Sequence, residues 1–336
     1  MVSREGSKMS NRDKAIRGDR GEVLSVGIAL AWLFVLAFHL SGCADTRTEV
    51  ALAEGALEIE PAPFQPSVTA YSVGGSCAPV SFKTMMNTFN THGTPEELAN
   101  KPGVMHLAER GRHLLYYPDG AGEFYDTRYL EPDAPAIQPM PDVVLFGAAE
   151  ELLDELGALD AGPVTVVRKG IEEWRRDAGG TAAGQMLLTH QVTVFEQRID
   201  KRKAFGPGAR IEVVFPGDDF PAAFSHGVRC LSVDETAVAL PVGLAIRSFE
   251  NRVARGYLWD LYGEQLPDPE TVEIQRLRLG HYVPRLGELA EYVDPVYEIK
   301  GVAKGLDGTG EPVVDEFIWY EPAIGGRGLP TTSPQD

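Results

Sequence analysis

An uncharged run of eighteen residues near the amino terminus, from Val23 to Leu40, limits which part of this chain can fold in water. Six basic residues precede it, namely Arg4, Lys8, Arg12, Lys14, Arg17 and Arg20. A charged region followed by an apolar one is typical of a secretory signal, and this run also approaches the length of a membrane-spanning helix. Under both interpretations the segment is not part of the folded domain, which lies outside the cytoplasm.

The residues directly after the apolar run distinguish the two interpretations. Leu40-Ser41-Gly42-Cys43 combines an aliphatic residue, two small residues and a cysteine, and it resembles the lipobox of bacterial lipoproteins. The resemblance implies that Cys43 is lipidated with diacylglycerol, that residues 1–42 are removed as a signal peptide, and that acyl chains such as palmitate anchor the product. A start at Met9 in place of Met1 would only shorten the signal. The alternative is an uncleaved transmembrane anchor with Cys43 as an incidental cysteine.

Lipidation at Cys43 predicts where the protein resides. Each buried methylene contributes about 0.8 kcal/mol, so two acyl chains hold a protein stably at a membrane. We therefore expect a lipid-anchored protein on the extracytoplasmic face of the cell membrane or the outer membrane, with the membrane as its partner through Cys43. Ala44 stands where proteobacterial lipoproteins that stay in the inner membrane carry Asp, which favours the outer membrane and the periplasm.

The mature chain after residue 42 is strongly acidic. It contains 25 lysines and arginines against 45 aspartates and glutamates, a formal charge of −20. Such a domain repels phosphate backbones, so we expect no nucleic-acid partner. The only tight basic cluster is Lys201-Arg202-Lys203, which we interpret as an exposed hairpin tip. The hydrophobic content of 43% is normal for a packed globular chain.

Two cysteines remain once Cys43 is assigned to the lipid. An extracytoplasmic compartment permits disulfides, and Cys77 with Cys230 is then the natural pair. The chain-entropy model assigns close to 5 kcal/mol to closing so long a loop. The alternative is two reduced, buried cysteines, with Cys230 in a strand-like run beside Val228 and Leu231.

Composition divides the chain into four parts. We expect a signal peptide over 1–42, a lipidated acidic spacer with several prolines over 43–66, a folded domain over 67–323 and a disordered tail over 324–336. Within the folded domain the pattern suggests three sub-units, 67–140, 142–231 and 234–323.

Local patterns inside the domain predict two helices and a series of strands. Apolar residues at helical spacing predict a helix with Asp142 as its N-cap and Gly157 as its C-terminal stop, and another from Pro241 to Gly256. Turn residues 118–122 predict a hairpin between 115–117 and 123–125. Further strands are expected over 163–168, 191–199, 210–215, 222–231, 271–279, 295–302 and 313–320, with residues 201–208 as a loop.

This order predicts an α+β fold in which a helix followed by an antiparallel three-strand meander is repeated. The repeated unit covers 142–231 and 234–321, and a degenerate copy covers 94–130. On shape alone, the pattern resembles the PepSY-like extracellular domains of bacteria, which implies a binding or inhibitory module.

Chemical motifs provide little support for catalysis. Gly74-Gly75-Ser76-Cys77-Ala78 resembles a nucleophile turn, but no spacing selects a partner among the scattered histidines. No zinc or nucleotide motif is present, so we expect no metal or cofactor. Asp218-Asp219 and Asp307-Gly308 are candidate calcium ligands that hairpin tips explain as well. The candidates for a carboxylate pair in hydrolysis are Glu172, Glu173, Asp234, Glu235, Glu288 and Glu291. The aromatic run Phe317-Ile318-Trp319-Tyr320 could line a ligand groove, but a core or edge strand explains it more simply.

The sequence therefore favours a membrane-anchored lipoprotein that binds or organises an envelope protein or polymer. No catalytic residues are assigned, and an enzyme is the less favoured class. The alternative is an envelope hydrolase that uses paired carboxylates or Cys77. Convergence of two carboxylates in one deep pocket would favour the enzyme.

Overall fold

β-Strands dominate the part of the chain that the computed structural model describes. The described residues are 49–53, 66–74, 80–130, 134–177, 186–255, 269–288, 291–306 and 309–327. They belong to one unit, Thr48–Asp336. The predicted signal segment, Cys43 and Cys77 lie outside the described residues. Within those residues, no helix is both long enough and apolar enough to span a membrane.

The predicted fold class, α+β with repeated helix-plus-meander units, is wrong. The described chain is mostly β, with one 14-stranded mixed sheet, a 3-stranded sheet and three α-helices. The helices are α2 (Phe82–Thr88), α3 (Asp142–Glu155) and α4 (Val242–Val253). The large sheet contains β1 (Glu49–Leu52), β3 (Glu96–Glu97), β4 (Met105–Glu109), β5 (Arg112–Tyr116), β6 (Gly122–Asp126), β7 (Asp160–Ala161), β8 (Val164–Asp177), β9 (Met186–Ile199), β10 (Arg202–Phe205), β11 (Arg210–Phe215), β12 (Ala223–His226), β14 (Thr271–Tyr282), β16 (Pro295–Leu306) and β17 (Pro312–Pro322).

β10 is the strand that merges the predicted units into one sheet. Its residues fall inside the predicted loop 201–208, yet β10 pairs antiparallel with β9 and parallel with β14. The path β17-β16-β14-β10-β9-β11-β12-β6-β5-β4-β3 is therefore continuous. Gly280 of β14 permits the contact, because a Cβ there would lie 2.1 Å from the Lys203 carbonyl oxygen. No local pattern reveals a pairing between segments so distant in sequence.

The 3-stranded sheet also collects distant segments. β2 (Ser67–Val73) lies between β13 (Leu231–Val238) and β15 (Tyr292–Val293). The single strand predicted over 222–231 is therefore two strands in different sheets, β12 and β13. The chain leaves the large sheet at Gly227, where a Cβ would approach the Gly208 carbonyl oxygen to 2.1 Å.

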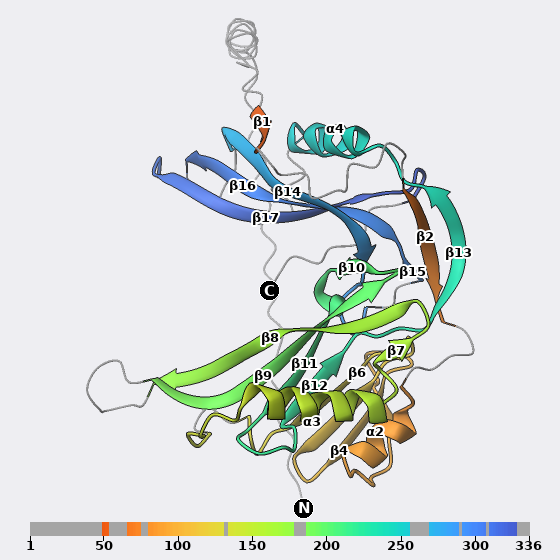
Figure 1. Ribbon diagram of the computed structural model, residues 1–336, viewed down its shortest axis with the longest axis vertical. Coiled ribbons are helices and arrows are strands. Elements are labelled where there is room, and N and C mark those ends of the chain that lie inside the picture. The colour runs from red at the N-terminus through yellow and green to blue at the C-terminus, as the bar shows by residue number, and fades with distance from the viewer. Residues whose placement is uncertain are drawn as a thin grey trace, which may run out of the picture. The chain divides into compact units, whose positions relative to one another are not determined.

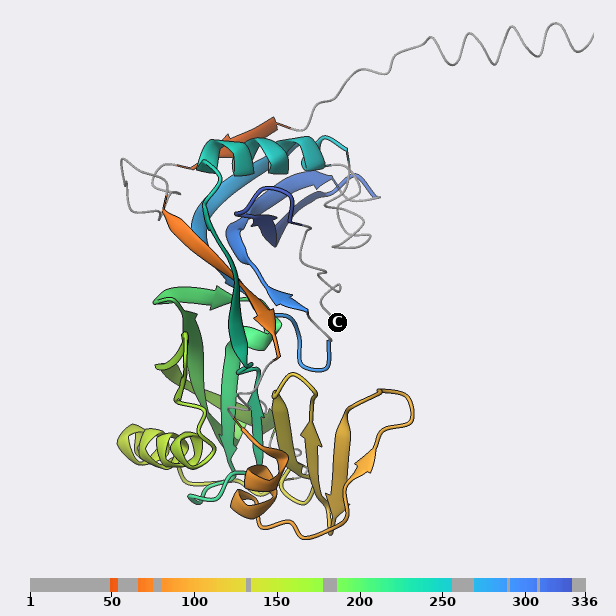
Figure 2. The same cartoon turned by 90° about the vertical axis from the view of Figure 1, so that its right-hand side faces the viewer.

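Both predicted helices are present, and each covers part of the large sheet. Leu145, Ala149 and Leu153 of α3 are fully buried, and Gly157 with φ 72° ends the helix as predicted. Pro141, rather than Asp142, is the N-cap residue. Figure 1 shows α3 across β9, β11 and β12, whereas Figure 2 shows α4 over β14, β16 and β17. The two helices pack into separate clusters of buried residues.

The hairpin turns follow local backbone chemistry. The predicted hairpin near 115–125 is present as β5 and β6. Asp200 and Lys201 have φ of 52° and 64° and form a two-residue turn between β9 and β10, the geometry that tight hairpins prefer. Lys201 is exposed at this tip as predicted, but Lys203 Nζ lies 2.9 Å from Glu196 Oε1.

Parts of the predicted spacer and tail have structure. Glu49–Leu52 forms β1 and pairs parallel with β14. At the other end, Ile324 is 4% exposed within a core cluster and Arg327 forms ion pairs with β13 carboxylates. Residues 43–48 and 54–65 of the spacer and 328–336 of the tail lie outside the described residues, so the predicted domain boundaries stay predictions.

Candidate functional site

The central strands of the large sheet carry two different faces. Phe124, Val213 and Phe224 point to the face on which α2 and α3 pack, because all three share one core cluster with residues of both helices. Side chains alternate along a strand, so the neighbouring residues point to the opposite face. On that face Glu123 pairs across to Ser225, and Ser225 to Glu212. We call this the open sheet face.

A hollow of about 170 Å³ lies on the open sheet face. β6, β8, β11 and β12 contribute its walls, and the alternation along these strands brings polar and aromatic side chains together. Its lining residues are Glu123, Phe124, Tyr125, Trp174, Glu212, Val214, Ala223, Phe224 and Ser225. The hollow is smaller than the roughly 300–1,000 Å³ of pockets for drug-sized ligands. It therefore suits one small group rather than a whole cofactor.

Negative charge predominates around the hollow. Arg210 Nη2 lies 2.6 Å from Glu172 Oε2, and Arg210 Nε also pairs with Glu212. Glu123 accepts a hydrogen bond from the Tyr117 hydroxyl at 3.0 Å, and no described lysine or arginine pairs with it. Three carboxylates thus face one guanidinium, a formal charge of −2.

Glu123 also acts on two neighbouring tyrosines. Burial raises the pKa of the Tyr117 and Tyr125 hydroxyls above their ordinary value, and the Glu123 carboxylate raises both further. Both hydroxyls therefore stay neutral near pH 7. The charge at this end of the hollow belongs to Glu123.

Three aromatic rings stand in a row beside the hollow. The Tyr125 and His113 rings are stacked with centroids 4.7 Å apart, and His113 and His106 follow at 5.4 Å. Burial, followed by the charge of His106, lowers the pKa of His113. Tyr125 ends the row and lines the hollow. Trp174 of β8, a residue that is 42% exposed, also lies there. Two aromatic rings and two carboxylates thus border one small space.

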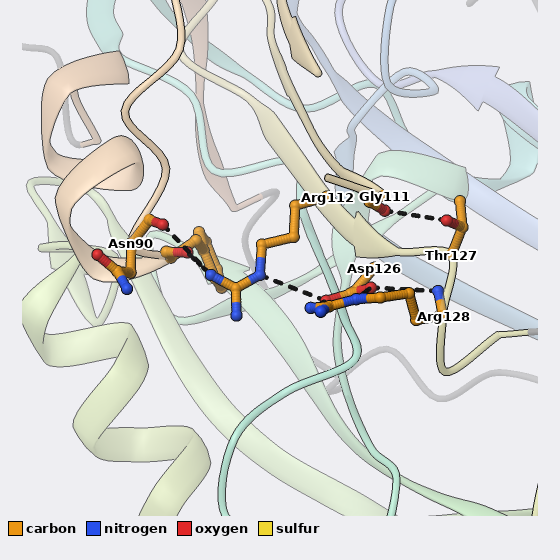
Figure 3. Close-up of polar contacts among 7 residues, drawn as sticks. Asn90, Gly111, Arg112, Asp126, Thr127 and Arg128 are labelled. Carbon is orange, nitrogen blue, oxygen red and sulfur yellow. Dashed lines mark hydrogen bonds and ion pairs between the residues drawn. The ribbon is translucent and has the colours of Figure 1, made fainter. Parts of the chain in front are cut away.

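A second polar cluster lies at the end of the β5–β6 hairpin (Figure 3). The Asp126 carboxylate is fully buried and accepts hydrogen bonds from Arg112 and Arg128. Burial alone would raise the pKa of Asp126, but the hydrogen bonds from both arginines outweigh it and lower the pKa. Arg112 also donates to the Phe89 and Asn90 carbonyls after α2. The charged groups of this cluster are hydrogen-bonded within it, so we interpret the cluster as a structural link between α2 and the sheet.

The predicted cysteines do not form a catalytic site among the described residues. Cys230 is 4% exposed and disulfide-bonded. The N–H of Gly74, the last described residue before Cys77, donates to the Cys230 carbonyl at 3.0 Å. The Cys77–Cys230 pairing stays a prediction, and this hydrogen bond favours it.

The other predicted site residues are spread over the molecule. Glu172 lies next to the hollow, whereas Glu173 pairs with Arg175, and Asp234 and Glu235 pair with Arg327. Glu288 ends one described segment and Glu291 begins the next, directly before β15.

The candidate calcium ligands do not converge either. Asp218 Oδ1 accepts the Phe220 N–H at 3.2 Å within a turn, and Asp307-Gly308 lies outside the described residues. No three His, Cys, Asp or Glu side chains of the described chain are grouped as metal ligands.

Sequence reasoning missed the hollow, although it recognised several of its strands. Glu123 and Tyr125 belong to a predicted strand, and their spacing of two residues shows that they share a face. Nothing in the sequence indicates that β12 places Glu212 on the same face as Glu123.

Comparisons with known proteins identify no family. No family model matches the chain, and no curated protein matches it. Among solved structures, an uncharacterized protein from Eubacterium rectale ATCC 33656 is similar over 80% of this chain and 86% of its own, with 10% sequence identity and a TM-score of 0.37. This likeness is too weak to support an argument about function.

Proposed function

We propose that this protein is a lipid-anchored, extracytoplasmic binding module, and that the open sheet face holds its partner, an envelope protein or polymer. The observation that carries the proposal is the hollow. Acidic and aromatic side chains line it on the sheet face opposite α2 and α3. Exposed aromatic side chains such as Trp174 are typical of contact surfaces.

The lipobox supports the membrane-anchored part of this proposal. Leu40-Ser41-Gly42-Cys43 follows an apolar signal-like run, and an acidic domain follows it. The hydrolase alternative has less support. Glu123 and Glu212 both border the hollow, but Glu212 is paired with Arg210 and the hollow is small, and Cys77 lies outside the described residues.

The anchor is tested by expressing the full gene in a bacterium and measuring the intact mass of the membrane-bound product. We expect loss of residues 1–42 and a lipid adduct on Cys43, and release of the adduct-free protein from membranes when Cys43→Ser is introduced. Acyl chains contribute about 0.8 kcal/mol per buried methylene, so their loss removes stable attachment. Retention of residues 1–42, or unchanged fractionation of the Cys43→Ser variant, contradicts the lipoprotein assignment.

The binding face is tested by photo-crosslinking in intact cells. A benzoylphenylalanine replaces either Trp174, which borders the hollow, or Val143 of α3, which is 77% exposed on the opposite side of the sheet. We expect a discrete crosslinked product from position 174 that is several-fold more abundant than any from position 143. Equal yields from both positions would contradict the assignment of the open sheet face as the binding surface.

A further inference from the structure

We infer that the hollow on the open sheet face binds an organic cation, an ammonium or guanidinium group. This inference rests on the proposed function and names the chemical class of its ligand. It follows from the charge, the aromatic rings and the size of the hollow taken together.

The charge of the lining selects the sign of the ligand. Glu123 has no described cationic partner, and Arg210 balances one of the two other nearby carboxylates, Glu172 and Glu212. A cation that approaches Glu123 replaces solvent with a charge-assisted hydrogen bond. The mature chain has a formal charge of −20, so its field also attracts cations and repels anions.

The aromatic rings favour an organic cation over a bare metal ion. The π faces of Trp and Tyr attract ammonium and guanidinium groups, and the attraction is stronger where water is excluded. His113 covers one face of the Tyr125 ring in a stack at 4.7 Å, while Tyr125 also lines the hollow with Trp174. No three potential metal ligands are grouped in the described chain, which agrees with this choice.

The size of the hollow limits the ligand to one group. About 170 Å³ accommodates the end of a lysine or arginine side chain, or a small quaternary amine. The same chemistry occurs in a basic segment of a protein partner and in a free small amine. The Ser225 hydroxyl, between Glu123 and Glu212, provides an additional polar contact for either.

The test uses the mature lipidated protein in detergent, with ¹⁵N-labelled tryptophan indoles observed by NMR. The Trp174 signal is identified by its absence in the Trp174→Phe variant. The probes are N-acetyl-arginine amide, N-acetyl-lysine amide, choline and an arginine-rich hexapeptide. Glucose and N-acetyl-glutamate amide serve as neutral and anionic comparisons. We expect the Trp174 signal to shift with the cations only, and binding to weaken as salt is added.

Two substitutions and one matched control locate the binding. Glu123→Gln is expected to weaken cation binding about tenfold because one charge is lost. Trp174→Ala removes the NMR reporter, so its binding is measured by calorimetry with N-acetyl-arginine amide and is expected to be about fivefold weaker than that of the wild type. Glu173→Gln removes a charge from the same strand as Trp174 but outside the hollow, and is expected to leave binding unchanged. Tighter binding of the hexapeptide than of choline identifies a protein side chain as the source, and the reverse identifies a small amine.

Several results overturn the inference. Equal shifts with glucose or the glutamate derivative, or equal weakening by Glu173→Gln and Glu123→Gln, would show that the hollow does not select cations. Absence of cation binding, while position 174 still crosslinks in cells, overturns the ligand class and leaves the proposed function standing. Cation binding without face-selective crosslinking overturns the proposed function instead.

Discussion

Replacing Arg229 with methionine is expected to lower the free energy of unfolding by about 3–5 kcal/mol, because the change leaves a buried carboxylate without its cation. Arg229 is 1% exposed, and its Nε lies 2.6 Å from Asp119 Oδ2. Its Nη1 and Nη2 donate to the carbonyls of Pro284 and Arg285. One side chain thus joins the β5–β6 turn, the segment before β13 and the loop before β15. Urea denaturation followed by circular dichroism measures the loss.

The matched control is Arg168→Met. Arg168 also forms an ion pair, with Glu150, but both side chains are at least a third exposed. Exposed pairs contribute about 1 kcal/mol or less, so this variant should remain close to wild type. Adding Asp119→Asn to Arg229→Met should recover part of the lost stability, because the amide is neutral and still accepts the Ala121 N–H. A loss from Arg229→Met no larger than that from Arg168→Met would refute a structural role for the buried pair.

Acid is expected to destabilise this protein through His226 before most carboxylates titrate. His226 is 0% exposed, and neither ring nitrogen has a hydrogen-bond partner among the described residues. Burial, aided by the charge of Arg229, lowers its pKa from 6.5 to about 3. Below pH 6.5 the His226 imidazole therefore binds a proton in the unfolded chain but stays neutral in the folded chain. The stability is fully present above pH 6.5 and falls by about 1.4 kcal/mol per pH unit down to about pH 3.

The His226→Met variant isolates this contribution. Methionine fits beside Met85 and Phe224, and it gives up no described hydrogen bond. Between about pH 6.5 and pH 5 the variant should lose about 2 kcal/mol less than wild type in urea unfolding. His281 and His113 also have lowered pKa values, so the stability of the variant still falls somewhat as the pH decreases. An exposed-histidine control, His92→Gln, should follow wild type. Identical pH slopes for wild type and His226→Met would contradict the burial of a neutral imidazole.

Local elements were predictable because their signals lie within one turn or one strand. The helices α3 and α4 follow from apolar residues at helical spacing, such as Ala245, Phe249 and Val253, which are all buried. The β5–β6 hairpin follows from the turn residues between its strands. Each of these predictions needs only neighbours in sequence.

The candidate site was not predictable in the same way. Glu123 and Glu212 share one region of the sheet because β12 lies between their strands and pairs with β6 on one side and β11 on the other. Trp174 and Glu172 reach the hollow through the long pairing of β8 with β9. In each of these pairings, neither strand's sequence indicates which other strand it pairs with. A chain with so many acidic residues offered many equivalent carboxylate pairs, and composition could not choose among them.

Sequence alone was sufficient for the acidic charge, the hairpin turn at 118–122 and the local helices and strands, since periodicity, charge and backbone preference are properties of short stretches. The signal segment lies outside the described residues and stays a prediction. The α+β class failed because it assumed that strands pair with their nearest neighbours. Folding instead placed β10 beside β14 and inserted β2 between β13 and β15. These arrangements depend on burying apolar faces and satisfying backbone hydrogen bonds across the whole chain. The Arg229–Asp119 pair and the hollow are consequences of that global packing, so they become visible only when the chain is folded.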